Sequence, residues 1–212
     1  MVMKMRLKNV KGAKERINKS KYIIIEPINL NLQKLFGNNN DVQLEIGTGK
    51  GDFLIEMARR NPNINFLGIE KYDSVLVRAI EKIDELELSN IYFIREDAME
   101  IDKILNKNIS KIYLNFSDPW PKERHAKRRL TSPEFLRKYD HIFKMGKEIQ
   151  MKTDNRKLFE YSLMSLVDYG YKIKELSLNL YEDDHEDNVT TEYETKFIKM
   201  GKIIYRALFS CD

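Results

Sequence analysis

The stretch LEIGTGKGDF, Leu44 to Phe53, joins a short apolar run to an amphipathic run through a turn with three glycines. Glycine adopts positive φ without a steric penalty, so Gly47, Gly49 and Gly51 let the backbone turn sharply and approach a ligand. The dinucleotide-binding fingerprint is G-x-G-x-x-G, whereas the spacing here is G-x-G-x-G. The stretch predicts a strand, a ligand-binding turn and a helix, the order that opens an α/β nucleotide-binding fold.

An acid, Glu45, lies two residues before the first glycine. Its carboxylate would repel a pyrophosphate and attract an ammonium group. S-adenosylmethionine (SAM) carries an ammonium and a sulfonium and no phosphate. The turn therefore favours SAM, with a nicotinamide cofactor or an ordinary structural turn as the alternatives.

Two further acids end the next two apolar runs. Glu70 ends a strand predicted over residues 64–70, where a carboxylate can accept both ribose hydroxyls of an adenosine. Asp97 ends a strand predicted over residues 91–97, next to the small residue Ala98, and could accept from an adenine amino group. Three acids at three successive strand ends indicate a SAM pocket more strongly than the glycine turn alone.

Apolar runs and helical patterns alternate along most of the chain. This alternation predicts the α/β class, a Rossmann-like parallel sheet with helices on both faces. Two last alternating runs are joined by an acidic loop rather than a helix, so we expect an antiparallel pair that completes seven strands. The predicted strands are 41–47, 64–70, 91–97, 111–116, 147–154, 171–181 and 196–209, and the predicted helices are 50–60, 72–88, 99–105, 132–145 and 156–170.

Length and charge suggest one domain preceded by a basic arm. The chain has 212 residues, and Met1 to Lys21 holds eight cations and one acid. We expect a flexible arm over residues 1–22, either a solubilising tail or a polyanion-binding arm, and one domain over 23–212. The single cysteine excludes a disulfide framework. No signal peptide and no long apolar run is present, so a cytoplasmic protein is expected.

The stretch NFSDPWPKERHAKRRL, Asn115 to Leu130, places a rigid acidic turn and a cationic ribbon directly after the predicted strand 111–116. Ligands of such sheets bind beyond the carboxyl ends of the strands, so Asp118 is expected where an acceptor enters. Pro119 and Pro121 fix φ and stiffen the turn. The alternatives are an acid that caps its own turn and a solvated face of cations.

At this point the chain resembles a known family. The segments EIGTGKG, GIE, EDA, NFSDPWPKERHAKRRL, TDNRKLFEY and TEYETKF look like those of the bacterial tRNA (guanine-N7)-methyltransferase family, in the same order, from about Glu45 to Phe197. The segment DPWPK-x-RH-x-KRRL is the most specific of them. The resemblance implies transfer of a methyl group from SAM to N7 of the guanine at position 46, in the variable loop of tRNA, without a metal ion.

The resemblance also implies roles for the residues at the matching positions. Asp118 would be catalytic. The cofactor would be bound by Glu45, Gly47, Gly49, Glu70, Asp97, Ala98 and Asp118. The substrate side would be lined by Lys122, Asp154, Thr191, Glu192, Tyr193 and Glu194, the last four at the entry to the final strand. The tRNA would be contacted by Arg124, His125, Ala126, Lys127, Arg128 and Arg129.

Guanine N7 carries a lone pair and no proton, so the transfer needs no general base. Positive charge moves from sulfur to the purine, and a carboxylate near the base, assigned to Asp118, favours that shift. Two other functions stay open: a methyltransferase for an exocyclic amino group, and a non-catalytic RNA-binding protein with a vestigial SAM fold. The acidic run Glu182–Asp187 has no assigned role, and the protein could be a monomer or a homodimer.

Overall fold

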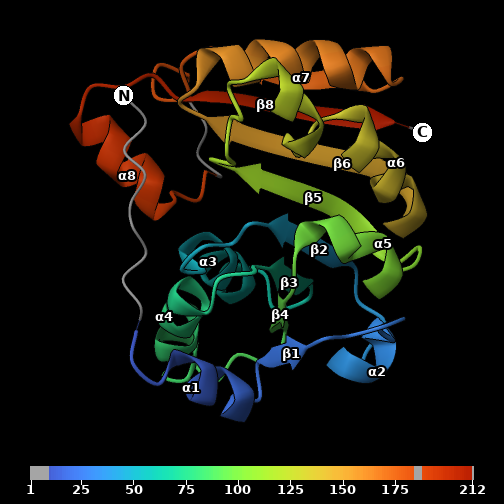
Figure 1. Ribbon diagram of the computed structural model, residues 1–212, viewed down its shortest axis with the longest axis vertical. Coiled ribbons are helices and arrows are strands. Elements are labelled where there is room, and N and C mark those ends of the chain that lie inside the picture. The colour runs from blue at the N-terminus through green and yellow to red at the C-terminus, as the bar shows by residue number, and fades with distance from the viewer. Residues whose placement is uncertain (1–9, 184–187, 212) are drawn as a thin grey trace.

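One mixed sheet of eight strands organises the computed structural model, which describes residues 10–183 and 188–211 (Figure 1). The strand order is β1-β4-β3-β2-β5-β6-β8-β7. Neighbours from β1 to β6 are parallel, and β8 pairs antiparallel with β6 and β7. The strands are β1 (Ile23–Ile25), β2 (Val42–Ile46), β3 (Asn65–Ile69), β4 (Ile91–Arg95), β5 (Ile109–Asn115), β6 (Phe143–Thr153), β7 (Lys172–Ser177) and β8 (Tyr205–Cys211).

Helices cover both faces of the sheet. One face packs against α1, α3 and α4, and the other against α2, α5, α6 and α7. Strand β3 shows the alternation, because Phe66 belongs to the first apolar cluster and Leu67 to the second. The helices are α1 (Ala13–Lys19), α2 (Leu32–Phe36), α3 (Asp52–Arg60), α4 (Asp73–Ile83), α5 (Ile101–Ile104), α6 (Pro133–Ile142), α7 (Arg156–Asp168) and α8 (Glu192–Lys199), with short 3₁₀ turns η1 (Ala98–Glu100) and η2 (Glu123–Arg128).

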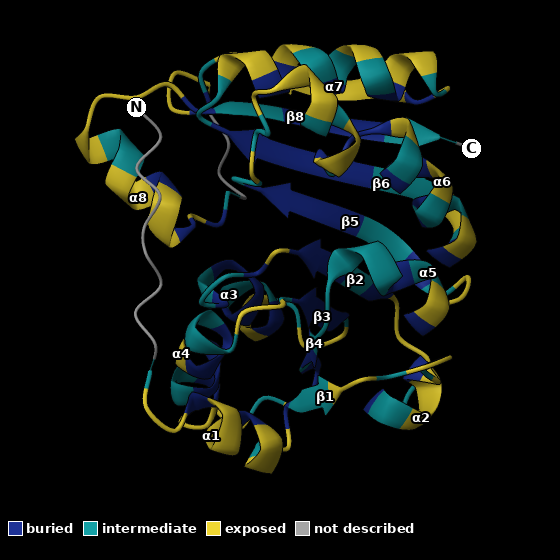
Figure 2. Ribbon diagram, viewed as in Figure 1, coloured by how far each residue is buried: buried dark blue, intermediate teal, exposed yellow. Residues whose placement is uncertain are grey.

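The predicted Rossmann-like fold is confirmed. The central strands are buried on both faces, as parallel strands between two helical layers must be, and Figure 2 shows β2 and β3 in the colour of buried residues. Helix α6 begins at the predicted cap, Ser132, with Pro133 at its first position. It ends at Ile142, earlier than predicted, because β6 begins at the next residue and pairs with β5.

The N-terminal region differs from the prediction of a flexible arm over residues 1–22. Residues 13–19 form α1, whose Ala13 and Ile17 are buried, and Ile17 packs in the apolar cluster that includes residues of α4. The Tyr22 carbonyl then accepts from Phe93 N at 2.8 Å, and β1 adds an eighth strand beside β4. The sequence signal for this helix is the pair Ala13 and Ile17, four positions apart among the cations, and the prediction missed it. Residues 1–9 of the predicted arm lie outside the described residues.

The prediction of one long strand over 196–209 is wrong. Its first residues form the end of α8, and the strand β8 starts only at Tyr205. Thr191 caps α8, and Glu194 bonds back to the backbone of Thr191, which completes a capping box. Gly201, with φ of 67°, follows the helix. The antiparallel C-terminal pair itself, β7 with β8, is confirmed.

The burial of α1 predicts a matched pair of variants. Ile17→Ala should lower the free energy of unfolding by about 2 kcal/mol or more, because it removes a side chain that is only 1% exposed. Ile28→Ala, at a residue 78% exposed, should change it by about 0.5 kcal/mol or less. Urea unfolding of both variants measures the difference, and equal stabilities would show that α1 is not part of the folded domain.

Candidate active site

Five acids lie at one edge of the sheet, at or just beyond the ends of five neighbouring parallel strands. In sheet order from β4 to β6 they are Asp97, Glu70, Glu45, Asp118 and Asp154. Parallel strands end at the same edge, so the acids form a row there, as the sequence predicts. In Figure 1 the arrowheads of β5 and β6 point to this edge, beside which α8 lies.

The glycine turn follows β2 and is hydrogen-bonded to residues at the end of β3. Gly47 and Gly49 have φ of 77° and 55°, a region that favours glycine. The amide of Gly47 donates to the Ile69 carbonyl at 2.9 Å, and the amide of Gly49 donates to Glu70 Oε2 at 3.2 Å. The turn therefore fixes one acid of the row through its own backbone.

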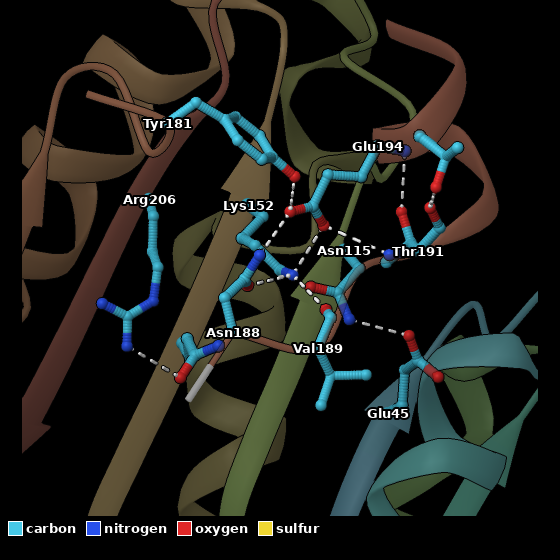
Figure 3. Close-up of polar contacts among 11 residues, drawn as sticks. Glu45, Asn115, Lys152, Tyr181, Asn188, Val189, Thr191, Glu194 and Arg206 are labelled. Carbon is cyan, nitrogen blue, oxygen red and sulfur yellow. Dashed lines mark hydrogen bonds and ion pairs between the residues drawn. The ribbon is translucent and has the colours of Figure 1, made fainter. Parts of the chain in front are cut away.

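Glu45 is buried at the centre of the row, 2% exposed. Its Oε1 accepts from Asn115 Nδ2 at 2.8 Å (Figure 3). Burial raises the pKa of Glu45 to about 8, against the effects of the Asn115 hydrogen bond and of the Lys152 ammonium. With its pKa near neutral pH, the Glu45 carboxyl group changes its charge in response to a modest change in the nearby electrostatics.

Three buried polar atoms near Glu45 have no hydrogen-bond partner among the described residues: Glu45 Oε2, Asn115 Oδ1 and Thr48 Oγ1. Buried polar atoms are nearly always paired in folded proteins. Asn115 Oδ1 can only accept, and Glu45 Oε2 can only accept once its carboxyl group is ionised, so a cationic donor fits these two atoms. An ammonium group, such as that of SAM, fits this set, whereas a phosphate would be repelled.

Glu45→Gln should stabilise the ligand-free protein at pH 8, by on the order of 5 °C in melting temperature. The folded-state pKa is raised from 4.5 to about 8, so the folded form holds a proton that the unfolded form has released between these values. Stability contributed by Glu45 is therefore lost as pH rises through this window, and glutamine avoids the loss. Thermal melts from pH 4.5 to pH 8 test this, and an advantage that does not shrink at pH 4.5 would contradict it.

Glu70 and Asp97, the two acids of the row on the β4 side of Glu45, accept hydrogen bonds from nearby backbone amides. Glu70 Oε1 accepts from the amides of Lys71 and Tyr72 at 2.9 and 3.1 Å, while burial raises the pKa of Glu70. Asp97 Oδ1 accepts from the Met99 amide at 3.0 Å. Lys71 Nζ lies 3.2 Å from Asp97 Oδ2 and so bridges the space between the two acids. Ala98 follows directly as the first residue of η1.

The turn after β5 contains two residues in the left-handed region, Phe116 with φ of 50° and Trp120 with φ of 41°. Such a conformation costs a side-chain-bearing residue free energy and persists only where its surroundings enforce it. The amide of Phe116 donates to the Lys152 carbonyl at 2.8 Å. Arg129 donates to the carbonyls of Pro119 and Trp120 at 3.3 and 3.2 Å.

Arg129 therefore differs from its predicted role as a tRNA contact. It is 8% exposed, and its guanidinium lies 4.2 Å from the centroid of the Tyr161 ring. Buried and bonded to two carbonyls, it holds the acidic turn in place rather than offering its charge to a phosphate. We infer that Arg129 positions the turn.

The other residues of the ribbon lie on η2 or at its cap, and most are exposed. Arg128 lies 5.0 Å from the Trp120 ring centroid, and the His125 ring packs edge-on against the same indole at 5.8 Å. Slight burial and the neighbouring cations lower the pKa of His125, whose contact with tRNA stays a prediction. The exposed cations are Lys122, Arg124, Lys127 and Arg128, and Ala126 is half-buried among them.

Glu194 is fully buried and forms an ion pair with Lys152 at 2.7 Å, and both side chains are 0% exposed. Lys152 Nζ also donates to the Val189 carbonyl at 2.8 Å, and Tyr181 donates to Glu194 Oε1 at 2.6 Å (Figure 3). Burial favours the neutral form of Glu194, but the Lys152 ammonium outweighs it and keeps the pKa of Glu194 below its ordinary value. Glu194 thus holds α8 on the sheet, and its predicted contact with substrate remains untested.

Three other predicted substrate residues have partners of their own. Glu192 forms an ion pair with Lys50 of the glycine turn at 2.6 Å, and Asp154 pairs with Lys202. Thr191 is engaged as the cap of α8 rather than as a strand residue. These contacts place the predicted substrate segment over the carboxyl edge of the sheet, on a helix whose signal in the sequence was the T-x-x-E spacing.

Asp118 and Tyr193 are the accessible members of the site. Asp118 is exposed and has no hydrogen-bond or ion-pair partner within residues 10–183 and 188–211. Tyr193 is 43% exposed, and its pKa is raised by burial and by the charges of Glu192, Asp118 and Glu70. The charges of Asp118 and Glu70 therefore both act on Tyr193.

The buried pair predicts strong coupling between its two members. Lys152→Met should cost about 3–5 kcal/mol of unfolding free energy, because it leaves the Glu194 carboxylate buried without a counter-charge. Adding Glu194→Met should recover much of this loss. Lys19→Met, which breaks an ion pair with Glu15 whose side chains are 74% and 71% exposed, should cost about 0.5 kcal/mol or less. Urea unfolding of the wild type, the two single variants Lys152→Met and Glu194→Met, the double variant and Lys19→Met measures the coupling, and additive costs of the two single variants would contradict it.

No group of three or more His, Cys, Asp and Glu side chains in the described part of the chain could hold a metal ion. No helix within that part of the chain is long and apolar enough to cross a membrane.

Comparisons with known proteins agree with this geometry. A family model described as a putative methyltransferase matches residues 39–207. The tRNA (guanine-N(7)-)-methyltransferases of Lachnoclostridium phytofermentans and Lysinibacillus sphaericus are 47% and 49% identical over 206 and 207 residues, and each alignment covers 95% of this chain and 96% of the relative. A solved antibiotic-related methyltransferase has a TM-score of 0.65 at 17% identity, over 88% of this chain and 97% of its own.

The sheet order and the glycine turn define a Rossmann-like domain, and the family model over residues 39–207 makes it a methyltransferase. The sequence identity to the two tRNA methyltransferases extends over 95% of this chain and identifies the family within this class. The chain belongs to the tRNA (guanine-N(7)-)-methyltransferase family.

Proposed function

We propose that this protein transfers a methyl group from SAM to N7 of a guanine in tRNA. The observation that carries the proposal is the buried Glu45 carboxylate with an unpaired oxygen, beside the unpaired Asn115 carbonyl, at the centre of the acidic row. A cationic donor fits this set. The names of the two close relatives support the acceptor.

When bound, SAM supplies an electrophilic methyl group on a sulfonium to the lone pair of guanine N7. Glu45 and Asn115 would bind its ammonium, Glu70 its ribose hydroxyls, and Asp97 with Ala98 its adenine. Gly47 and Gly49 allow the backbone to pass close to the ligand. Glu45, Glu70 and Asp97 belong to strands on the same side of β5, whereas Asn115 and the acceptor turn lie at the end of β5 itself.

Asp118 is the residue that favours transfer. Its free carboxylate would accept hydrogen bonds from the N1/N2 edge of the guanine and so orient N7 toward the methyl group. It also attracts the positive charge that builds on the purine, an interaction of roughly 4 kcal/mol at 4 Å and an effective dielectric of 20, an upper value for one acid. The remaining acceleration comes from holding the two reactants in line.

The exposed cations of the ribbon are placed to bind the tRNA backbone. Lys122, Arg124, Lys127 and Arg128 lie directly after the acceptor turn, so a phosphate bound there fixes the RNA close to Asp118. Such contacts position an RNA without reading its sequence. Lys122 would also serve the substrate side of the pocket, as Asp154 and Thr191–Glu194 would from the neighbouring strand and from α8. A cytoplasmic location remains an expectation from the sequence.

Asp118→Ala should lower methyl transfer to tRNA by about 100-fold while tRNA binding changes little, because the ribbon stays intact. Asp168→Ala, which removes an exposed acid at the end of α7, is the matched control and should keep full activity. Unmodified tRNA is incubated with SAM and each protein, then analysed by nucleoside mass spectrometry and by borohydride and aniline cleavage at N7-methylguanosine.

Three outcomes would reject the proposal in different ways. Methylated adenine without N7-methylguanosine would show that the wild-type protein acts on an amino group. Absence of any methylation by the wild-type protein would favour a non-catalytic RNA-binding role. Equal activity of Asp118→Ala and wild type would remove Asp118 from the reaction.

A further inference from the structure

We propose that Phe116 is a stacking residue for the target guanine, with Tyr193 as the second ring of the same site. The inference rests on the proposed function and assigns a substrate contact to a residue outside the acidic row and outside the cationic ribbon. Its basis is the position, the backbone conformation and the ring contacts of Phe116.

Phe116 lies between the two halves of the site. The residue before it, Asn115, bonds Glu45 of the cofactor half, and Asp118 of the acceptor half follows two residues later. A ring at this position is next to the place where the methyl group passes from donor to acceptor. A flat purine bound there needs an apolar face as well as the edge contacts that Asp118 provides.

The backbone of Phe116 is held in an unfavourable conformation. Its φ of 50° lies in the left-handed region, where a bulky side chain is a true outlier. Its amide is fixed by the Lys152 carbonyl at 2.8 Å, and the side chain of Lys152 is itself fixed by Glu194. A strained residue fixed by a buried network, at the edge where ligands bind, is typical of a functional position.

The ring of Phe116 belongs to a small aromatic group at the opening. It is stacked with Tyr193, with centroids 6.3 Å apart and an angle of 25° between the planes, and it contacts Phe197 at 5.8 Å. Phe116 is half-buried, and none of the three rings belongs to the buried apolar clusters of the described domain. The apolar faces of these nearly parallel rings suit a purine, which has two apolar faces and a polar edge, and Asp118 follows Phe116 by two residues.

The second ring is carried by a rigid element. Tyr193 lies between Glu192, paired with Lys50, and the buried Glu194, so the first turn of α8 is fixed on both sides. A mere packing role for Phe116, as an anchor for α8, needs only apolar volume. A stacking role needs an aromatic face, and this difference decides the experiment.

The test compares Phe116→Leu and Phe116→Tyr with the wild type in single-turnover methylation of tRNA at saturating SAM. Base stacking on an aromatic ring contributes enough binding energy that its loss should slow transfer by about tenfold to a hundredfold in Phe116→Leu. Phe116→Tyr keeps the face and should stay within about threefold of wild type. The affinity for S-adenosylhomocysteine and the melting temperature should change little in either variant. Phe36→Leu, which removes a ring packed on Tyr92 at the opposite edge of the sheet, is the matched control and should keep the wild-type rate.

The outcomes separate this inference from the proposed function. A wild-type rate in Phe116→Leu would overturn the stacking role while leaving the proposed function intact. Equal losses in Phe116→Leu and Phe116→Tyr would also overturn it, because side-chain fit rather than an aromatic face would then be required. A parallel loss of S-adenosylhomocysteine affinity would reassign Phe116 to the cofactor pocket. A wild-type protein that forms no N7-methylguanosine would reject the proposed function itself, and the same variants would then be compared on the base that is methylated.

Discussion

The ion pair between Lys152 and Glu194 is the interaction on which the site depends. It lies at the end of β6, fully removed from solvent, and joins three parts of the chain that are distant in sequence. The lysine side chain holds the start of α8, its carbonyl holds Phe116, and its charge acts on Glu45. Such a pair contributes little net stability compared with apolar residues of the same size, so its value lies in the single arrangement that it enforces.

The proposed site has two halves that differ in burial: a cofactor half around Glu45 and an acceptor half around Asp118. The proposed cofactor half is buried around Glu45 and Asn115, whose side chains each leave one oxygen without a hydrogen-bond partner among the described residues. The acceptor half is open and strained, with Phe116 and Trp120 in the left-handed region and Asp118 free. Similar residues have different roles here. Within the run of cations Arg129 alone is buried, and it donates to two carbonyls of the turn.

The sequence was sufficient for the elements whose signals are local. The strand ends at Glu45, Glu70 and Asp97 follow from apolar runs that stop at an acid, and the sheet class follows from their alternation with helices. The sequence was insufficient where tertiary contacts determine the secondary structure or the role of a residue. The apolar alternation after Thr191 suggested a strand, but a capping box and the burial of Glu194 against Lys152 make a helix. The roles of Lys152, Asn115 and Arg129 depend on partners 10 to 70 residues away, which no local pattern reveals.

The proton on Glu45 has a consequence for the energetics of loading. A carboxyl group with a pKa near 8 is largely neutral at pH 7, yet it must be ionised to bind an ammonium. On the proposed function, binding of SAM would therefore release a proton from Glu45 into the medium. The spent cofactor keeps its ammonium, so the carboxylate would stay ionised until that molecule leaves and would then take up a proton again.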